Sequence, residues 1–409
     1  MFAETAIATD LITPLRAYLR LRAEGRASFL LESVEHGRLG RHSFVGAGRR
    51  LCTFAQAETC GEPIVGYLGY DFAATLEPTV PLPEEGRAFP ESRIVVPETL
   101  VRFDHVQGSA EVLRGDVDAV AALLGSPQPE LDRAGGRTGA TERFPAQAAY
   151  EQIVRAGKDH IRAGDVFQVV LSQRAVRPTS AGAVELYRAL RRINPSPYLF
   201  LLELDGVALI GSSPETLVKA EGARASLNPI AGTSGVDAGD ADRLLRSEKD
   251  RAEHVMLVDL GRNDLSRVCR AGTVRVARFL EPERFSHVTH LVSEVVGELR
   301  DGVSHFDLLR ACFPAGTVSG APKVRAMQLI SEFEGYRRGI YAGAVGYALP
   351  GDVLDTCIAI RTIVLADGVA YLQAGAGIVA DSDPTAEHEE CLRKLAALEA
   401  AIELAEAGR

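Results

Sequence analysis

The stretch from Gln373 to Pro384 places a strand, two glycines and a helix start next to one another. Apolar residues at positions 370, 372 and 374 alternate with larger or polar ones, which is the period of a half-buried strand. Gly375 and Gly377 then predict a turn whose backbone can approach another group closely, because glycine has no Cβ. Asp383 followed by Pro384 is typical of a helix start, with Asp as the N-cap.

On the predicted helix, Glu387, Glu390 and Lys394 are spaced by three and four residues and therefore share a face. Two carboxylates and an ammonium beside a glycine turn can hold a divalent cation and an anionic ligand together. A solvated polar stripe is the alternative interpretation of the same spacing. The stretch from Gly375 to Ala380 also fits the dinucleotide template G-x-G-x-x-A, but too few residues follow to complete a βαβ unit.

A second acidic pair, Asp250 and Glu253, has the same helical spacing, although such a pair alone is also typical of an exposed surface. Mg²⁺ is held through one or two carboxylates, with water and substrate oxygens completing the shell. One glutamate from each helix, Glu253 and Glu390, would leave most of that shell open. The two pairs together therefore suggest a magnesium site.

Other residues are suited to anions. The glycine loops at Gly232-Thr233 and at residues 315–323 can present backbone N–H groups. Arg361 ends an apolar strand, where a bidentate grip on a carboxylate explains it better than solvation does. His290 lies among apolar residues, so a satisfied core histidine and a functional one both remain open.

Composition excludes several classes of protein. The 409 residues carry a net charge of -10, which argues against general nucleic-acid binding. The six cysteines form no CxxC pair, so neither a disulfide framework nor a zinc site is indicated, and reduced thiols fit a cytoplasmic protein. No run approaches eighteen apolar residues and the N-terminus lacks a basic region. We therefore expect neither export nor a membrane span.

The order of predicted elements gives the fold class. Short strands mix with helices, often in hairpin order, which favours α+β with antiparallel sheets over a doubly wound parallel sheet. Residues 126–144 are rich in Pro, Gly and charge and predict a loop or linker. This segment divides a β-rich N-terminal subdomain, residues 1–125, from a larger portion, residues 145–409.

Several long motifs make the chain similar to a known family. It resembles the chorismate-utilising enzymes and, within them, the large subunits of anthranilate synthases. The resemblance covers about residues 145–400 and rests on runs at residues 228–233, 249–265, 285–290, 316–329 and 373–384. It implies two antiparallel sheets packed face to face and flanked by helices, with the N-terminal subdomain, expected to be regulatory, as part of this fold.

The resemblance also implies roles for individual residues. Glu253 and Glu390 would bind Mg²⁺, with Asp250 and Glu387 in support, although the family usually has Glu where Asp250 stands. His290 would assist the elimination step, and Glu215 and Thr233 would line the substrate ring. Chorismate would be held by residues on several elements: Gly232, Thr233, Tyr341, Arg361, Gly375, Ala376, Gly377 and Lys394.

Two positions bear on which reaction is catalysed. Aminodeoxychorismate synthases typically carry a nucleophilic Lys where Ala231 stands, and isochorismate or salicylate synthases a Lys where Gln168 stands. Both differences favour anthranilate synthase, a Mg²⁺-dependent lyase of tryptophan biosynthesis. Those sister enzymes and a catalytically silent regulatory subunit remain the alternatives, with a dinucleotide oxidoreductase more distant.

The resemblance further implies a partner and a regulator. No cysteine lies in the Gly-x-Cys-x-Gly setting of a glutaminase, so ammonia would come from a separate glutamine amidotransferase subunit. Two segments resemble the halves of a tryptophan feedback pocket, with a strand and a proline turn as the alternative interpretation. The expected tryptophan-binding residues are Leu31, Glu32, Ser33, Pro197, Tyr198 and Leu199. The family's N-terminal portion is usually longer than that of this chain.

Overall fold

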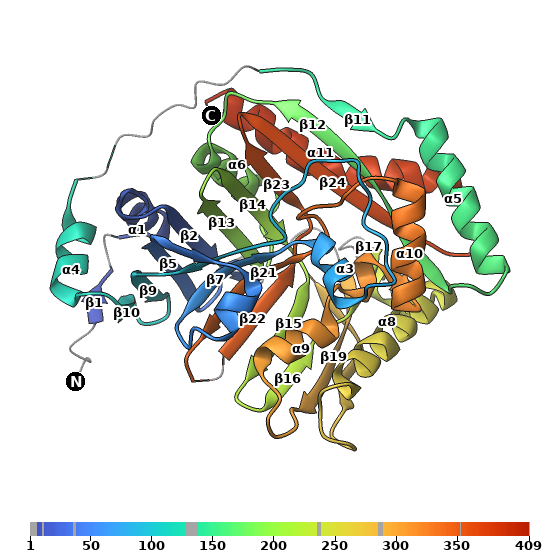
Figure 1. Cartoon of the computed structure of the whole chain (residues 1–409), viewed down its shortest axis with the longest axis horizontal. Coiled ribbons are helices and arrows are strands. Elements are labelled where there is room, and N and C mark those ends of the chain that lie inside the picture. Colours follow the sequence, from blue (N-terminus) through green and yellow to red (C-terminus); the bar gives the residue numbers. More distant parts are fainter. Residues whose placement is uncertain are drawn as a thin grey trace.

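Two large antiparallel β-sheets form the centre of the molecule, and helices lie on their outer sides in the computed structural model (Figure 1). The structure describes residues 6–9, 12–35, 38–127, 129, 138–234, 239–284, 289–351 and 353–408. All ladders between the named strands are antiparallel. The α+β class and the face-to-face arrangement expected from the sequence are therefore confirmed.

The first sheet joins strands from both ends of the chain. Its described strands, in spatial order, are β1 (Ala6–Ala8), β10 (Ser109–Arg114), β9 (Thr99–Asp104), β5 (His42–Gly48), β2 (Ala27–Glu32), β13 (Tyr198–Leu204), β14 (Val207–Ser213), β23 (Thr362–Ala366), β24 (Val369–Ile378), β12 (Gln168–Pro178) and β11 (Glu142–Phe144), and β20 (Gly320–Ala321) also pairs with β12.

The second sheet is similarly mixed. Its described strands, in spatial order, are β17 (Ile230–Ser234), β19 (Thr289–Glu298), β16 (Arg224–Leu227), β15 (Thr216–Glu221), β22 (Val353–Ile358), β21 (Ala344–Leu349), β7 (Ile64–Leu68), β8 (Ser92–Val96) and β6 (Arg50–Cys52), and β18 (Arg275–Arg284) pairs with β19. A small ribbon consists of β3 (Val34–Glu35) and β4 (Arg38–Leu39). Residues 1–125 thus contribute strands to both large sheets.

The helices connect and cover these sheets. The described α-helices are α1 (Pro14–Leu21), α2 (Phe54–Glu58), α3 (Ala73–Leu76), α4 (Val117–Gly125), α5 (Gln147–Arg162), α6 (Ala183–Ile193), α7 (Asp240–Arg246), α8 (Glu248–Ser266), α9 (His305–Cys312), α10 (Lys323–Glu334) and α11 (Pro384–Glu406). Short 3₁₀ turns are η1 (Arg22–Glu24), η2 (Tyr70–Phe72) and η3 (Gly316–Val318). In the described part of the chain, no helix has the length and apolarity needed to cross a membrane.

A layer of apolar side chains holds the two sheets together. Phe29, Phe200 and Leu209 of the first sheet pack with Val65 and Val345 of the second in one buried cluster. Each of these side chains is at most 2% exposed. Burial at this level contributes about 1.5–3 kcal/mol for each large side chain, so this layer fixes how the sheets lie on one another.

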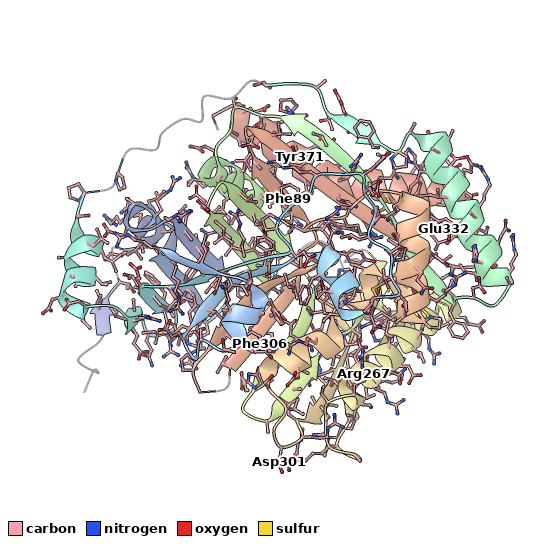
Figure 2. The ribbon with its side chains drawn as sticks, viewed as in Figure 1. Phe89, Arg267, Asp301, Phe306, Glu332 and Tyr371 are labelled. Atoms are coloured by element: carbon pink, nitrogen blue, oxygen red, sulfur yellow. The ribbon has the colours of Figure 1, made fainter. Side chains whose placement is uncertain are left out.

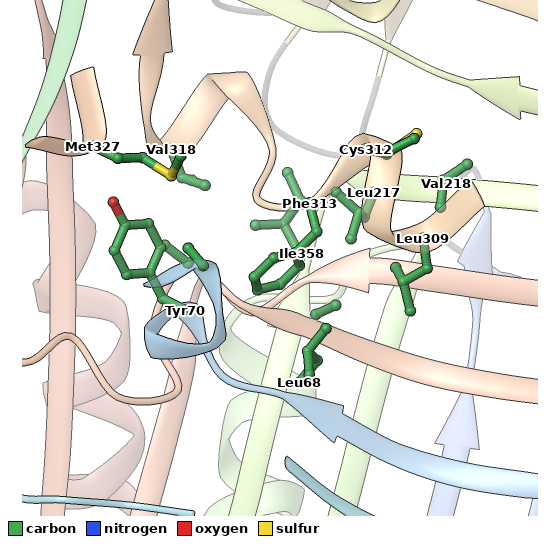
Figure 3. Packing of buried hydrophobic residues seen from close by; sticks show 14 of the residues in the cluster. Leu68, Tyr70, Leu217, Val218, Leu309, Cys312, Phe313, Val318, Met327 and Ile358 are labelled. Atoms are coloured by element: carbon green, nitrogen blue, oxygen red, sulfur yellow. The ribbon is translucent and has the colours of Figure 1, made fainter. Parts of the chain in front are cut away.

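Two further clusters attach the helices. On the outer side of the first sheet, α6 and α11 pack on strand residues such as Leu201 and Leu372. On the second sheet, Leu309 and Phe313 at the end of α9 pack with Leu68 and Ile358, and Figure 3 shows these four side chains around one space. Leu395 and Leu398 of α11 pack with Leu372 and Ala374 of β24, which fixes this helix against the strand.

Large aromatic rings cover glycines on neighbouring strands of the first sheet. Phe200 on β13 lies opposite Gly211 on β14, and Phe29 on β2 lies opposite Gly46 on β5. A Cβ on Gly211 would lie 2.0 Å from the tip of the Phe200 ring. The ring therefore occupies the space that a side chain at position 211 would need.

We predict that Gly211→Ala destabilises the protein by about 1–3 kcal/mol, because the added methyl forces the buried Phe200 ring to move. Denaturant unfolding measures this change. Gly125→Ala is the control, since a Cβ there meets nothing within 4 Å and the residue ends a helix. Equal stability of the Gly211→Ala variant and the wild type would contradict this packing.

Candidate active site

Gly375 and Gly377 lie within strand β24, not in a turn as the sequence predicted. They pair with Ser172 and Val170 of β12 and neither has a positive φ. A Cβ on Gly375 would lie 2.8 Å from the Tyr341 hydroxyl oxygen, and one on Gly377 would lie 2.3 Å from Gln168 Nε2. The glycines are therefore needed for close approach of other side chains, not for an unusual backbone conformation.

The start of α11 confirms the expected cap. The Asp383 side chain accepts a hydrogen bond of 2.9 Å from the Ala386 N–H, and Pro384 occupies the first helical position. Two residues of the predicted polar face, Glu390 and Lys394, lie beside β24. The Lys394 Nζ is 2.6 Å from Glu390 Oε1 and donates to the Gly375 carbonyl at 2.7 Å. The glutamate and lysine predicted from spacing are thus brought to the glycine strand.

Arg361 lies between β22 of the second sheet and β23 of the first. Its φ of 51° is in the left-handed region, which a residue with a side chain adopts at a cost, and such strain is concentrated at functional sites. Burial lowers the pKa of Arg361, whereas Tyr341, Glu390 and Glu215 act to raise it. The guanidinium therefore lies among the groups that the sequence assigned to the substrate site.

Glu215 follows β14 and lies near both cations. Burial raises the pKa of Glu215 to about 7, although Thr317, Lys394 and Arg361 lower it. The residue also lines a cavity of about 40 Å³ together with Leu257 and Leu260 of α8 and with Gly316 and Thr317 of η3. A carboxyl with this pKa can give or take a proton near neutral pH.

Ala376 contributes only its backbone to the site. It pairs with Leu171, and its methyl group is completely buried in the apolar cluster under α5 and α10. The predicted contact of the backbone of residues 375–377 with substrate stays a prediction.

The remaining predicted residues lie on two other elements. Glu253 is on α8, four residues before Leu257 and seven before Leu260, so it shares the helix face that lines the Glu215 cavity. Thr233 on β17 pairs with His290 on β19, and Gly232 precedes it in the same strand. The side chains of Asp250 and Thr233 are outside the described part. The pairing of Glu253 with Glu390 at one metal stays a prediction.

The donor chemistry of these helices suits a hard cation. In the described part of the chain, no group of three or more His, Cys, Asp and Glu side chains is arranged to hold a metal. Glu390 is half-exposed, Glu253 is half-buried, and Glu387 is buried at 9% exposure. Carboxylates that reach one site from two helices, with the remaining ligands supplied by substrate and water, fit Mg²⁺.

Sequence reasoning missed a buried polar cluster under the site. The Glu334 carboxylate accepts hydrogen bonds from the Ser172 N–H at 2.8 Å and the Ser172 hydroxyl at 2.7 Å, and pairs with Arg338 at 2.6 Å. The Arg338 guanidinium lies over the Tyr341 ring at 5.6 Å. Glu334 and Arg338 have the i, i+4 spacing of a surface pair, so the sequence signal exists but does not reveal burial.

The six expected tryptophan-binding residues line one pocket of about 260 Å³ between the two sheets. The pocket is closed on the second sheet by Tyr347 and Asp355. One carboxylate oxygen of Glu32 pairs with Arg191 at 3.2 Å, while the other, Oε1, is buried and has no hydrogen-bond partner among the described residues. Tyr187 and Arg191 of α6 hold this fully buried carboxylate on the outer side of the first sheet, so Glu32 borders the pocket without turning its carboxylate into it.

We predict that Glu215 makes stability depend on pH. Its folded pKa is about 7 and its unfolded pKa about 4.3, so the folded state holds the proton more tightly. The resulting stabilisation is present below the unfolded pKa and is lost as pH rises through 7. Relative to the Glu215→Gln variant, the free energy of unfolding of the wild type should fall by on the order of 1–3 kcal/mol between pH 5 and pH 8. Parallel pH profiles from denaturant unfolding would contradict the shift.

Comparisons with known proteins show which family the chain matches. A family model described as chorismate binding enzyme matches residues 16–400. The anthranilate synthase component 1 of Thermus thermophilus is 43% identical over 453 aligned positions, covering 98% of this chain and 97% of that protein. The alignment is longer than the 409 residues of this chain, so that relative carries segments that this chain lacks.

Solved structures agree on the fold. The anthranilate synthase component I of Streptococcus pneumoniae superimposes with a TM-score of 0.78 at 34% identity, over 97% of this chain and 100% of that one. The menaquinone-specific isochorismate synthase of Escherichia coli, at 22% identity, shares the fold with a TM-score of 0.76 over 97% of this chain and 94% of its own. These findings confirm the resemblance noted in the sequence, and the chain belongs to the family of chorismate-binding enzymes.

Proposed function

We propose that this chain acts as the large subunit, component I, of an anthranilate synthase, converting chorismate and ammonia to anthranilate and pyruvate. The observation that carries this proposal is the convergence of Arg361, Lys394, Glu390 and Glu215 at the glycine end of β24. It is supported by relatives named anthranilate synthase component 1 that match the chain over nearly its full length.

Two cations match the two carboxylates of chorismate. Arg361, with Tyr341 and the backbone of residues 375–377, would hold the carboxylate of the enolpyruvyl group. Lys394 would face the ring carboxylate, for which it would exchange one of its present partners, Glu390 and the Gly375 carbonyl. Separate cations for two carboxylates fix both the position and the orientation of the ring.

Glu253 and Glu390 would bind Mg²⁺, with Asp250 and Glu387 in support. When bound, the ion would supply charge stabilisation near the ring carboxylate. Glu390 is already oriented by Lys394, and Glu387 lies one turn before it on the buried side of α11. The helices α8 and α11 would hold these carboxylates in fixed positions.

The reaction has two steps. Ammonia attacks C2 of chorismate as the C4 hydroxyl leaves as water, and loss of the C2 proton with release of pyruvate then gives anthranilate. Glu215, with its pKa near 7, can transfer a proton in the first step. His290 would assist the second, and Thr233, opposite it in the ladder, would line the ring.

The sister reactions are less well supported. Gln168 is 3% exposed, and its amide lies against Gly377 at the site. An amide cannot serve as the base that activates water for isochorismate formation. Ala231 offers no nucleophile for the aminodeoxychorismate route. The likeness to the isochorismate synthase concerns the fold alone.

Ammonia would come from a separate glutamine amidotransferase subunit. Burial raises the pKa of the Cys312 and Cys357 thiols, and that of Cys391 to about 11. Such thiols are poor nucleophiles at neutral pH. These three thiols therefore do not support glutaminase chemistry, and none of the six cysteines stands in a Gly-x-Cys-x-Gly setting.

The pocket between the sheets would bind tryptophan as a feedback inhibitor. Its apolar and aromatic walls, Leu31, Pro197 and Tyr347, suit an indole ring, and the Asp355 carboxylate on the second sheet suits the ammonium group. Ser33 and Tyr198 also line it, and the Tyr198 hydroxyl donates to Asp355 at 3.0 Å. The pocket is built from both sheets, so a ligand there contacts each of them.

We predict that the purified chain forms anthranilate from chorismate, Mg²⁺ and an ammonium salt at alkaline pH. Fluorescence of the product measures the rate. Glu253→Gln and Glu390→Gln should each lower it by at least roughly 100-fold, because a metal site contributes several kcal/mol to catalysis.

Glu389→Gln is the matched control, since this neighbouring side chain is 61% exposed on the solvent side of α11. It should retain the wild-type rate. Unchanged rates in both Glu253→Gln and Glu390→Gln would refute the metal assignment. Anthranilate formed from glutamine by this chain alone would refute the separate subunit.

We predict that tryptophan binds to the unmodified chain and that Ser33→Phe abolishes this binding, because the larger ring fills the pocket. Isothermal calorimetry measures both, with the unfolding temperature of the variant without tryptophan as a check on folding. If the unmodified chain gives no heat of binding, or if the variant gives the same heat, the pocket is not a tryptophan-binding site.

A further inference from the structure

A further cavity, of about 80 Å³, is lined by strands of the first sheet that include the glycine strand β24. Its floor is formed by β12, β23 and β24, and its rim by the loops around residues 87–89 and 337–341. Figure 2 shows two of its aromatic residues, Phe89 and Tyr371, next to each other, and their ring centroids are 5.5 Å apart. We refer to it as the arginine pocket.

Four guanidinium groups line the arginine pocket, and no carboxylate does: Arg87, Arg174, Arg337 and Arg338. Two of them are neutralised elsewhere. Arg338 pairs with Glu334 at 2.6 Å, and Arg87 pairs with Asp367 at 2.6 Å. Arg87 also donates to the Tyr371 hydroxyl at 2.7 Å and lies over both aromatic rings at 5.1 Å.

The other two guanidiniums form no ion pair in the described part of the chain. The guanidinium carbon of Arg174 lies 4.2 Å from the centroid of the Tyr336 ring and 5.4 Å from that of the Phe144 ring. Its Nε is buried and has no hydrogen-bond partner among the described residues. Arg337 donates its Nε to the Pro83 carbonyl at 3.0 Å. Burial raises the pKa of the nearby Asp71 carboxyl, whereas Arg337 acts to lower it, so the charge of Arg337 is partly compensated. In the described part of the chain, Arg174 is thus the guanidinium of this space that has neither an ion pair nor a hydrogen-bond partner for its Nε.

We propose that the arginine pocket binds a small oxyanion, such as inorganic phosphate or a short carboxylate, at a site distinct from the chorismate site. A buried N–H without a partner costs about 1–3 kcal/mol, and an oxygen ligand on Arg174 would remove that cost. Guanidiniums bind carboxylate and phosphate through paired N–H groups, and the low dielectric of a recess strengthens the attraction. The same charges repel ammonium, so this cavity does not suit that cation.

The arginine pocket and the proposed chorismate site share Tyr341. Tyr341 lines the arginine pocket, and its hydroxyl lies against Gly375. Gln373 lines it as well and donates to the Ser172 hydroxyl at 2.8 Å, within the buried cluster around Glu334. An anion in the pocket would thus bind next to side chains that support the chorismate site.

Thermal unfolding of the chelator-treated protein tests this proposal. Sodium phosphate, sulfate and malonate are each titrated at constant ionic strength against chloride. We expect a saturable rise of roughly 2–4 °C with at least one of the oxyanions, and the three arms show whether phosphate-like or carboxylate ligands are preferred. No rise above the chloride control with any of them would overturn the proposal.

Variants locate the bound anion. Arg174→Gln and Arg337→Gln should each weaken the response at least about tenfold in apparent affinity. Arg162→Gln, an exposed arginine on α5, is the control for net charge. Arg361→Gln should keep the response, because it removes a cation from the chorismate site only. A response lost in Arg361→Gln and kept in Arg174→Gln would place the anion in the chorismate site and refute the proposal. If Arg174→Gln does not fold, the half-exposed Arg337 still decides the outcome.

Discussion

The buried ion pair between Glu334 and Arg338 holds the centre of this enzyme in place. Both side chains are almost fully excluded from water, and removal of one partner of such a pair typically costs about 3–5 kcal/mol. Arg338 donates to the carbonyls of Val170 on β12 and Val318 in η3, while Glu334 holds Ser172. One charge pair thereby ties a helix, a strand and a turn together near Tyr341, and the residues proposed to hold chorismate lie around it.

Next to this ion pair, other side chains approach the backbone of β24 closely because two of its residues have no side chain. Strand β24 carries glycine at 375 and 377, so the Tyr341 hydroxyl and the Gln168 amide come within contact of its backbone. Lys394 then reaches the Gly375 carbonyl from α11, whose start is set by Asp383 and Pro384. Lys394 is therefore placed by a regular helix, which positions a side chain more rigidly than a loop does, whereas Arg361 lies in the short connection between β22 and β23.

Much of this arrangement could be predicted from local patterns. The helix start at Asp383 and the shared face of Glu390 and Lys394 follow from spacing alone, and the structure has both. Gly375 and Gly377 suggest a turn in the sequence but lie in a strand, because the lack of a Cβ serves both turns and close packing and the sequence does not distinguish the two. The arginine pocket could not be foreseen, since its members are far apart in sequence and only the sheet order brings them together.

Arg361 occupies the point where the chain passes from one sheet to the other. β22 of the second sheet ends three residues before it, and β23 of the first begins directly after it. Asp355 and Cys357 of β22 also line the pocket between the sheets. The same strand, β22, therefore borders the pocket between the sheets and leads into the connection that carries Arg361.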